Sequence, residues 1–198
     1  MDRNASTPAV ILAGGLSRRM GGGDKGLLPW GGGTVLSAVR DRLASQAAPL
    51  ALNANGDPAR FAALGLPVLP DPLPGHLGPL AGLLAAMDWA AALGAPLVLT
   101  VPGDAPFLPF DLLPKLLEAG PPAIAASAGR LHPVAGLWPV TLREALREAL
   151  AQGTRRVRAF AQARGAQAAE FPVPPGGPDP FLNLNTPEDL LAARGWLR

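Results

Sequence analysis

The sequence predicts an α/β fold in which a mostly parallel sheet is covered by helices on both faces. Short apolar runs alternate with segments whose apolar residues recur every three or four positions, which is the pattern of βαβ units. The runs VILA and LVLTV are apolar without alternation, as expected of strands buried on both faces. Glycine and proline, 24 of each in 198 residues, separate these runs and form no repeats, so we expect one domain over residues 1–198.

The first part of the chain is expected to form four strands, each followed by a loop or helix. Leu36, Val39 and Leu43 share one helical face, and a glycine ends a second helix at Gly94. Pro114 lies inside a third predicted helix. We expect it in the first turn of that helix, because the first turn tolerates proline and the middle does not. The expected order is strand 9–14, helix 34–46, strand 49–53, short helix 57–65, strand 66–71, helix 78–94, strand 96–104 and helix 110–120.

The pattern changes after Gly120. Two apolar segments, 123–128 and 130–140, predict a strand pair that is antiparallel, which gives the sheet a small mixed part in its C-terminal half. A helix is expected over 141–153. Near the C-terminus, Thr186 is a predicted helix N-cap because proline and two acidic residues follow it directly.

Composition and charge exclude several classes of protein. Lysine and arginine exceed aspartate and glutamate by only two, 17 against 15, and the cations are scattered, so nucleic acid is not an expected partner. The chain has no cysteine, which excludes disulfides and thiolate metal sites. It shows neither a signal sequence nor an apolar run long enough to cross a bilayer, so we expect a cytoplasmic protein without a membrane partner.

Polar residues and glycines follow the predicted strands at the points where the strands end. Ligands of open parallel sheets bind outside the carboxyl ends of the strands, so we expect these residues to share one site. They are Gly14 and Gly15 at the end of the first run, Asn53 at the end of the second, Asp71 at the end of the third and Asp104 at the end of the fourth.

The loop GGLSRRMGGGDKG at 14–26 is typical of a polyphosphate site. Glycine N–H groups can approach phosphate oxygens closely, and Arg19 and Lys25 supply positive charge. The alternative is a flexible surface turn. A GxGxxG match inside the loop lies about seven residues beyond the strand, too far for a dinucleotide fingerprint, and Lys25 is not part of a GK[ST] P-loop.

Asp104 is the strongest candidate for a metal ligand. It follows a buried strand within VPGDAP, and Mg²⁺ prefers one or two carboxylates together with phosphates and water. Asp71 precedes a proline, so a turn role is its alternative. His132 has no serine or aspartate partner that the sequence identifies, which leaves a hydrolytic triad unsupported.

The quoted residues resemble the MobA family of molybdenum cofactor guanylyltransferases. The resemblance runs from about residue 9 to 191 and covers LAGGLSRRMGGGDKG, NANG at 53–56, GPLAG at 78–82, PGDAPFLP at 102–109, RLHP at 130–133, RRV at 155–157 and NLNTPEDL at 183–190. It implies a Rossmann-like nucleotidyltransferase fold, with a nucleotide-binding half over about 1–110 and an acceptor-binding half over about 111–198.

The resemblance implies transfer of GMP from Mg-GTP to Mo-molybdopterin, with release of pyrophosphate. A molybdoenzyme or a cofactor-loading protein would receive the product. Carried over by position, the residues and their roles are Leu12, Ala13 and Gly14 at the nucleotide, Lys25 at its phosphates, Asn53 and Asp71 at the guanosine, Asp104 at GTP and Mg²⁺, and Asn183 and Asn185 on the pterin side. The glycine loop itself adds Gly15 as a nucleotide-binding candidate and Arg19 as a catalytic candidate beside Lys25 and Asp104.

Related functions stay open at this point. Cytidylyltransferases and sugar-phosphate nucleotidyltransferases are similar to this chain. Those two families resemble each other in having Ala-Ala-Gly at the start of the loop and Pro-Lys at its end, whereas this chain has Ala13-Gly14-Gly15 and Asp24-Lys25. A non-catalytic nucleotide-binding regulator is a third alternative, against which Lys25 and Asp104 argue. Gly56 stands where a charged residue is frequent in the family, so the guanosine wall is expected to differ in detail.

Overall fold

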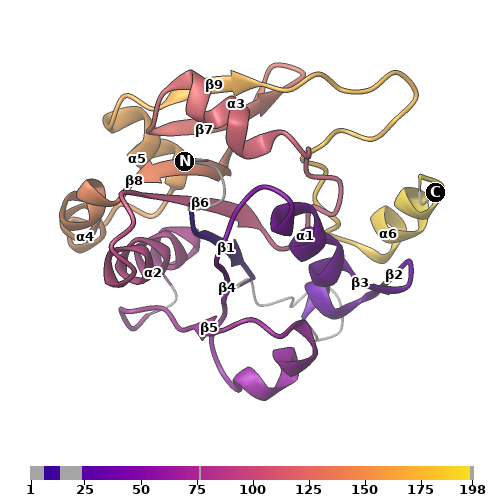
Figure 1. Ribbon diagram of the computed structural model, residues 1–198, viewed down its shortest axis with the longest axis horizontal. Coiled ribbons are helices and arrows are strands. Elements are labelled where there is room, and N and C mark those ends of the chain that lie inside the picture. The colour runs from indigo at the N-terminus through magenta and orange to yellow at the C-terminus, as the bar shows by residue number, and fades with distance from the viewer. Residues whose placement is uncertain (1–6, 14–23, 76, 197–198) are drawn as a thin grey trace.

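A seven-stranded sheet forms the centre of the molecule. The structure, a computed structural model, describes residues 7–13, 24–75 and 77–196. The strand order is β5-β4-β1-β6-β8-β7-β9, and a two-stranded hairpin, β2-β3, lies apart from it (Figure 1). The strands are β1 Ala9–Leu12, β2 Pro29–Trp30, β3 Gly33–Thr34, β4 Leu50–Asn53, β5 Val68–Leu69, β6 Leu97–Pro102, β7 Ala123–Ser127, β8 Arg130–Pro139 and β9 Gln167–Glu170.

The directions of the strands bring several strand ends together at one edge of the sheet. β1 pairs in parallel with β4 and β6, and β4 pairs in parallel with β5. β8 runs antiparallel to both β6 and β7, while β9 is parallel to β7. Within the described part of the large sheet, every strand except β8 therefore points the same way, and the carboxyl ends of β1, β4 and β6 meet at one edge. The expected antiparallel pair in the C-terminal half is confirmed.

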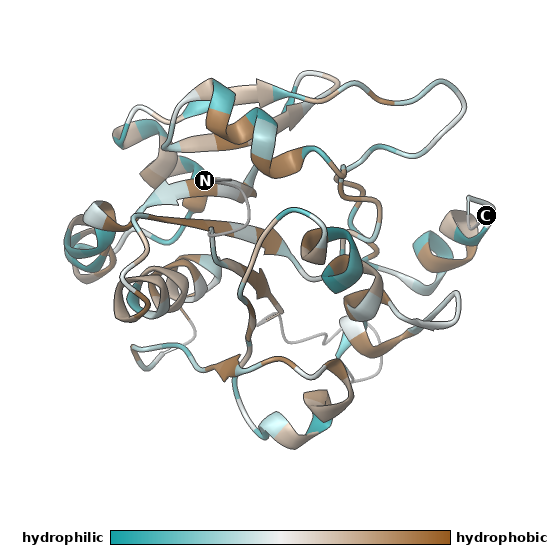
Figure 2. Ribbon diagram, viewed as in Figure 1, coloured by the Kyte–Doolittle hydropathy of each residue, from teal (hydrophilic) through white to brown (hydrophobic). Residues whose placement is uncertain are grey.

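Helices cover both faces of the sheet. They are α1 Val35–Ala44, α2 Pro79–Ala92, α3 Leu112–Ala119, α4 Arg143–Ala151, α5 Val157–Ala163 and α6 Pro187–Arg194, with the 3-10 helices η1 Lys25–Leu27, η2 Pro58–Leu64 and η3 Val140–Leu142. Within β1, Ile11 packs with α1 and α3 on one face, whereas Val10 packs with α2, α4 and α5 on the other. Figure 2 shows the hydrophobic colours on the central strands and teal on outward helix surfaces. The predicted α/β class is confirmed.

Helix ends follow the signals in the sequence. Thr34 and Thr186 each form a capping box, in which the threonine side chain accepts from the third helical residue and that residue's side chain accepts in return. Gly94, at φ +70°, follows α2. Pro114 is the third residue of α3, in its first turn as expected. The expected helix 141–153 begins instead with the 3-10 turn η3 before α4.

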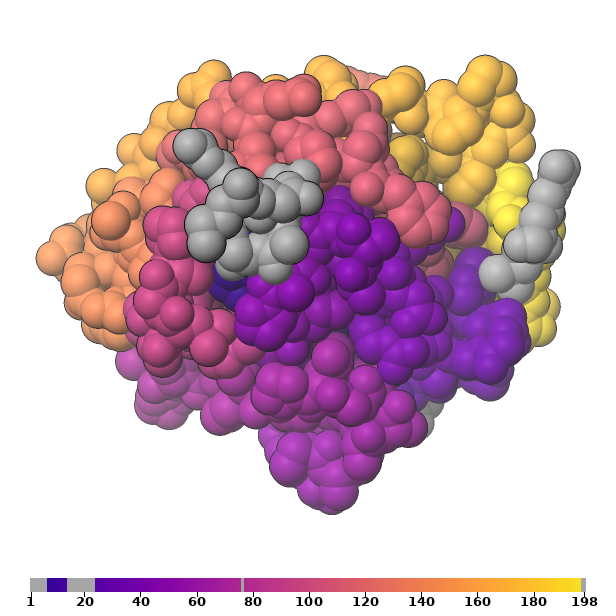
Figure 3. Space-filling view, viewed as in Figure 1, coloured from indigo at the N-terminus to yellow at the C-terminus, as the bar shows by residue number. Residues whose placement is uncertain are grey.

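The C-terminal helix closes back onto the start of the chain. Leu190 and Ala193 of α6 are buried with Trp30 of the β2-β3 hairpin and with Val35. Figure 3 shows the yellow C-terminal residues beside purple N-terminal ones on the right of the molecule. Leu184 belongs to the same cluster, so this contact holds the C-terminal side of the segment that carries Asn183 and Asn185. No helix in the described part of the chain is long and apolar enough to span a membrane.

Candidate active site

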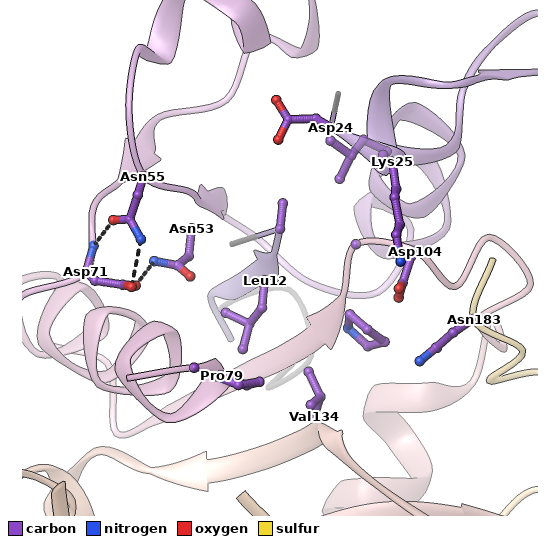
Figure 4. Close-up of a pocket in the computed structure, with 16 residues that line it drawn as sticks. Leu12, Asp24, Lys25, Asn53, Asn55, Asp71, Pro79, Asp104, Val134 and Asn183 are labelled. Atoms are coloured by element: carbon purple, nitrogen blue, oxygen red, sulfur yellow. Dashed lines mark hydrogen bonds between the residues drawn. The ribbon is translucent and has the colours of Figure 1, made fainter. Parts of the chain in front are cut away.

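A pocket of about 500 Å³ opens at the carboxyl ends of β1, β4 and β6. Its volume lies in the range of small-molecule sites. Asn53, Asn55 and Asp71 stand at one end and Lys25, Asp104 and Asn183 at the other, with Leu12, Pro79 and Val134 between them (Figure 4). The remaining lining residues are Ala13, Asp24, Gly26, Leu36, Gly78, Pro102 and Gly103.

Two asparagine amides hold the Asp71 carboxylate. Its Oδ1 accepts from Asn53 Nδ2 at 3.0 Å, and its Oδ2 accepts from Asn55 Nδ2 at 2.7 Å. The backbone N–H of Asp71 donates to Asn55 Oδ1 at 2.9 Å, so Asn55 contacts Asp71 twice. Each carboxylate oxygen can accept more than one hydrogen bond. The wall formed by Asn53, Asn55 and Asp71, here called the Asn-Asp wall, is thus a rigid acceptor for N–H or O–H groups of a ligand.

A glycine in α2 makes room for this wall. Asn53 is 2% exposed, and its Nδ2 also donates to the Leu69 carbonyl at 3.0 Å. A Cβ at Gly82 would collide with Asn53 Oδ1 and would lie 3.3 Å from Leu12 Cδ2. Any side chain at position 82 would therefore displace Asn53 from Asp71.

Lys25 lies at the opposite end of the pocket. It begins η1, and a Cβ at the next residue, Gly26, would collide with the Leu36 side chain, so only glycine lets this turn pack on α1. Lys25 Nζ donates to Asn185 Oδ1 at 3.0 Å. An ammonium group has three donors, and among residues 7–13, 24–75 and 77–196 only Asn185 takes one of them by a hydrogen bond. This bond joins the turn after the glycine loop to the segment before α6.

Asp104 reaches the pocket because β6 closes onto β1. The N–H of Gly103 donates to the Leu12 carbonyl at 3.0 Å. A Cβ at Gly103 would lie 3.0 Å from Leu36 Cδ2 and 3.3 Å from Ala13 Cβ, so glycine allows this approach. The Asp104 carbonyl accepts from the N–H of Leu184 at 2.8 Å, which ties the segment before α6 to the end of β6.

Burial dominates the electrostatics of Asp104. It raises the pKa of the Asp104 carboxyl above its ordinary value of 3.8, while a backbone hydrogen bond and the positive charge of Lys25 act in the opposite direction. A buried carboxylate is stabilised by a cation placed beside it. Asp104 is therefore suited to hold a positive ion that arrives with a ligand.

The donor set fits a metal that a nucleotide brings with it. No group of three histidine, aspartate or glutamate side chains able to hold a metal occurs in the described ranges. Asp104 alone offers one carboxylate, and Mg²⁺ is commonly held by one or two carboxylates together with phosphate oxygens and waters. The residues therefore fit Mg²⁺ bound jointly with a triphosphate.

An arginine that does not line the pocket connects two parts of its wall. Arg60 of η2 pairs with Asp24, with Nε 2.6 Å from Oδ2, and its Nη2 donates to the Asn55 carbonyl at 2.6 Å. A Cβ at Gly56, whose φ is +84°, would lie 2.9 Å from Arg60 Nη1. Gly56 thus leaves space for the guanidinium, which links the turn carrying Lys25 to the Asn-Asp wall.

The structure brings most of the predicted site residues together. Those that line the pocket are Leu12, Ala13, Lys25, Asn53, Asp71, Asp104 and Asn183. Asn185 lies behind Lys25 and contacts it. The predicted residues Gly14, Gly15 and Arg19 lie outside the described residues. The turn role considered for Asp71 does not account for its two side-chain bonds to the asparagines.

Sequence reasoning missed two residues of the site region, Asn55 and Arg60, and two partners of His132, Ser127 and Asp179. Asn55 follows Asn53 by two positions, and that spacing on one side of an extended chain was the signal that could have revealed it. Arg60 lies in a short helix with no feature that points to the pocket.

Ser127 Oγ lies 2.8 Å from His132 Nε2 and 2.9 Å from both carboxylate oxygens of Asp179, so His132 does have the partners that the sequence did not identify.

Comparison with known proteins agrees with this geometry. The family model described as the MobA-like NTP transferase domain matches residues 9–168. A molybdenum cofactor guanylyltransferase of Rhodopseudomonas palustris (strain HaA2) is 55% identical over 196 residues, which cover 95% of this chain and 91% of that protein.

Solved structures agree in fold. The molybdopterin-guanine dinucleotide biosynthesis protein A of Archaeoglobus fulgidus superposes with a TM-score of 0.68 at 20% identity, over 96% of this chain and 97% of that one. The 4-diphosphocytidyl-2C-methyl-D-erythritol synthase of Anaerococcus prevotii superposes with a TM-score of 0.73 at 14% identity, over 98% of this chain and 96% of that one. The fold is thus common to several nucleotidyltransferases and does not by itself identify the family. Sequence identity does: this chain belongs to the family of molybdenum cofactor guanylyltransferases.

Proposed function

We propose that this chain binds GTP with Mg²⁺ and transfers GMP to the phosphate of Mo-molybdopterin, forming the guanine dinucleotide cofactor. The observation that carries the proposal is the pocket itself, which has an acceptor wall at one end and Lys25 with Asp104 at the other. A nucleoside triphosphate has the same polarity, since its base and ribose carry N–H and O–H donors and its phosphates are anionic.

In the proposed reaction an oxygen of the pterin's phosphate attacks the α-phosphorus of GTP. A new O–P bond forms, the bond between the α-phosphorus and the bridging oxygen breaks, and pyrophosphate leaves. Two anions approach each other and negative charge grows on the leaving group, so catalysis depends on neutralisation and alignment. Beyond its bond to Asn185, Lys25 has two ammonium donors without a hydrogen-bond partner in the described part of the chain, and these can donate to phosphate oxygens. Mg²⁺ bound at Asp104 would add a second centre of positive charge.

The Asn-Asp wall is the proposed site for guanosine. Asp71 accepts but cannot donate when ionised, and Asn53 and Asn55 fix its orientation. Guanine presents two neighbouring N–H groups that such a carboxylate can accept, whereas cytosine offers only its exocyclic amine. This difference favours GTP over CTP. Asn183 and Asn185, at the phosphate end, are the proposed residues on the pterin side.

A direct product assay tests the proposal. Purified protein with GTP, Mg²⁺ and Mo-molybdopterin is expected to release pyrophosphate and to form the guanine dinucleotide, identified by mass spectrometry. Replacing GTP by CTP should reduce product strongly. Equal activity with CTP would favour a cytidylyltransferase, and tight GTP binding without any pyrophosphate release would favour a non-catalytic regulator.

A further inference from the structure

The segment that supplies the proposed pterin-side residues needs an anchor. None of residues 171–186, all of which the structure describes, belongs to a helix or strand. Asn183 nevertheless lines the pocket and Asn185 contacts Lys25. Holding an irregular segment in one conformation costs conformational entropy, which specific contacts must offset.

Ser127, at the carboxyl end of β7, provides such a contact from inside the protein. Its side chain is fully buried. Both carboxylate oxygens of Asp179 lie 2.9 Å from its Oγ, and Asp179 Oδ1 also accepts from the N–H of Phe181 at 2.8 Å. A half-buried aspartate is thus bonded to the sheet on one side and to its own segment on the other.

His132, near the start of β8, completes the cluster. Its Nε2 lies 2.8 Å from Ser127 Oγ, and its ring stacks on Phe181 with centroids 4.6 Å apart. Phe181 in turn packs edge-on against Phe171, at 5.3 Å. Because the carboxylate of Asp179 can only accept, the Ser127 hydroxyl donates to it, and His132 Nε2–H donates to Ser127. Burial lowers the pKa of His132, although the charge of Asp179 acts in the opposite direction.

This connectivity excludes a hydrolytic triad. In a triad the histidine stands between serine and aspartate and removes the serine proton. Here Ser127 stands in the middle, its proton is directed to Asp179, and it has no exposure to a substrate. The cluster therefore has a positional role.

We propose that Asp179, Ser127 and His132 form an anchor that positions residues 181–185 for binding of the phosphorylated acceptor. They are positioning residues, since none of them lines the pocket. From the anchor, the chain passes through Asn183 to the Leu184 N–H, which the Asp104 carbonyl accepts at 2.8 Å, and to Asn185 at Lys25. The identity of the acceptor rests on the proposed function.

Asp179→Ala removes the bonds to Ser127 and to the Phe181 N–H, whereas Asp179→Asn keeps an acceptor oxygen for both. The matched control is Gln46→Ala. Gln46 is also buried, makes three side-chain bonds to the backbone of Arg42, Pro109 and Leu113, and does not line the pocket. It should lower thermal stability without affecting residues 181–185.

Two measurements are made on each variant: hydrogen–deuterium exchange over residues 181–186, and separate KM values for GTP and Mo-molybdopterin. We expect Asp179→Ala to raise exchange in this segment and to raise the KM for Mo-molybdopterin about tenfold, with the KM for GTP changed less than about twofold. Asp179→Asn should restore most of the acceptor affinity.

The anchor is refuted if exchange over 181–186 does not rise in Asp179→Ala, if both KM values rise together, or if Gln46→Ala gives the same changes. A wild-type protein that transfers no GMP would refute the proposed function instead, and the exchange rates alone would then decide on the anchor.

Discussion

At the scale of single residues, Asp104 shows a conflict between function and stability. Burial raises the pKa of its carboxyl, so the folded protein binds that proton more tightly than the unfolded chain does. Its stabilising contribution is present below pH 3.8 and is lost as pH rises through the folded-state pKa. At pH 7 the ionised carboxylate therefore opposes folding.

Asp104→Asn removes the charge and keeps the shape of the side chain. We expect GMP transfer to fall on the order of a hundredfold or more, because the proposed metal loses its carboxylate. The Tm at pH 7 should equal or exceed that of the wild type, and the difference should shrink toward pH 4. Rate measurements and melting curves at both pH values test this, and a normal rate with a lowered Tm at pH 7 would contradict the metal role.

Lys25 offers a second residue-scale test, because the chain has only one other lysine, Lys115. Lys25→Ala should weaken GTP binding and turnover together, each by about tenfold or more, since an ammonium group beside the phosphates stabilises both the ground state and the transition state. Lys115 pairs with Asp111 and lies over the Phe171 ring, away from the pocket. Lys115→Ala is the control and should leave GTP titrations and rates unchanged.

At the scale of elements, the ends of β4 and β5 act as one unit through Asn55. Asn55→Asp would place a second carboxylate against Asp71 Oδ2, where the amide now donates at 2.7 Å. We expect GTP affinity to fall by about tenfold at pH 7, because like charges repel at this distance. Calorimetric titration of GTP into wild type and Asn55→Asp measures this loss, and an unchanged affinity would argue against this wall as the nucleoside site.

Elements with a strong local signal could be predicted from the sequence. β4 ends at Asn53 as expected, because PLALNANG is an apolar run closed by polar residues and glycine. α6 begins at Pro187, after the predicted Thr186 cap. The β2-β3 hairpin has two residues in each strand, too few for a periodic pattern. α5 and β9 were not expected either, since α5 is seven residues long and three of the four residues of β9 are exposed.

The residues of the site also fall into those that the sequence predicts and those that it does not. Asn53, Asp71 and Asp104 could be predicted because each lies at the end of a strand or within two residues of it, and parallel strands bring their carboxyl ends together. The Ser127–Asp179 contact joins residues 52 positions apart, and the partner of a buried hydroxyl has no local signature. Contacts of this kind depend on the packing of an irregular segment against the sheet, which local sequence patterns do not encode.

At the scale of the whole molecule, the pocket collects residues from both ends of the chain. Lys25 follows the glycine loop, Asp104 lies near the middle, and Asn183 precedes the last helix. A ligand that spans this pocket contacts β4, β6 and the segment before α6 together, so its binding should stabilise the whole fold. A ligand that binds only the native state raises stability by about 2.7 kcal/mol at 100 times its Kd.

For a chain of this length, that gain corresponds to a rise in Tm of about 5–10 °C. We expect GTP with Mg²⁺ to reach this range, and CTP and UTP to give smaller shifts because the Asp71 carboxylate meets fewer N–H donors on their bases. Omitting Mg²⁺ should reduce the GTP shift in the wild type but much less in Asp104→Asn, since that variant has lost the proposed ligand of the ion. Thermal melts with each nucleotide, with and without Mg²⁺, measure both effects. A CTP shift equal to that of GTP would move the base preference to cytosine, and an equal Mg²⁺ effect in wild type and Asp104→Asn would place the ion elsewhere in the pocket.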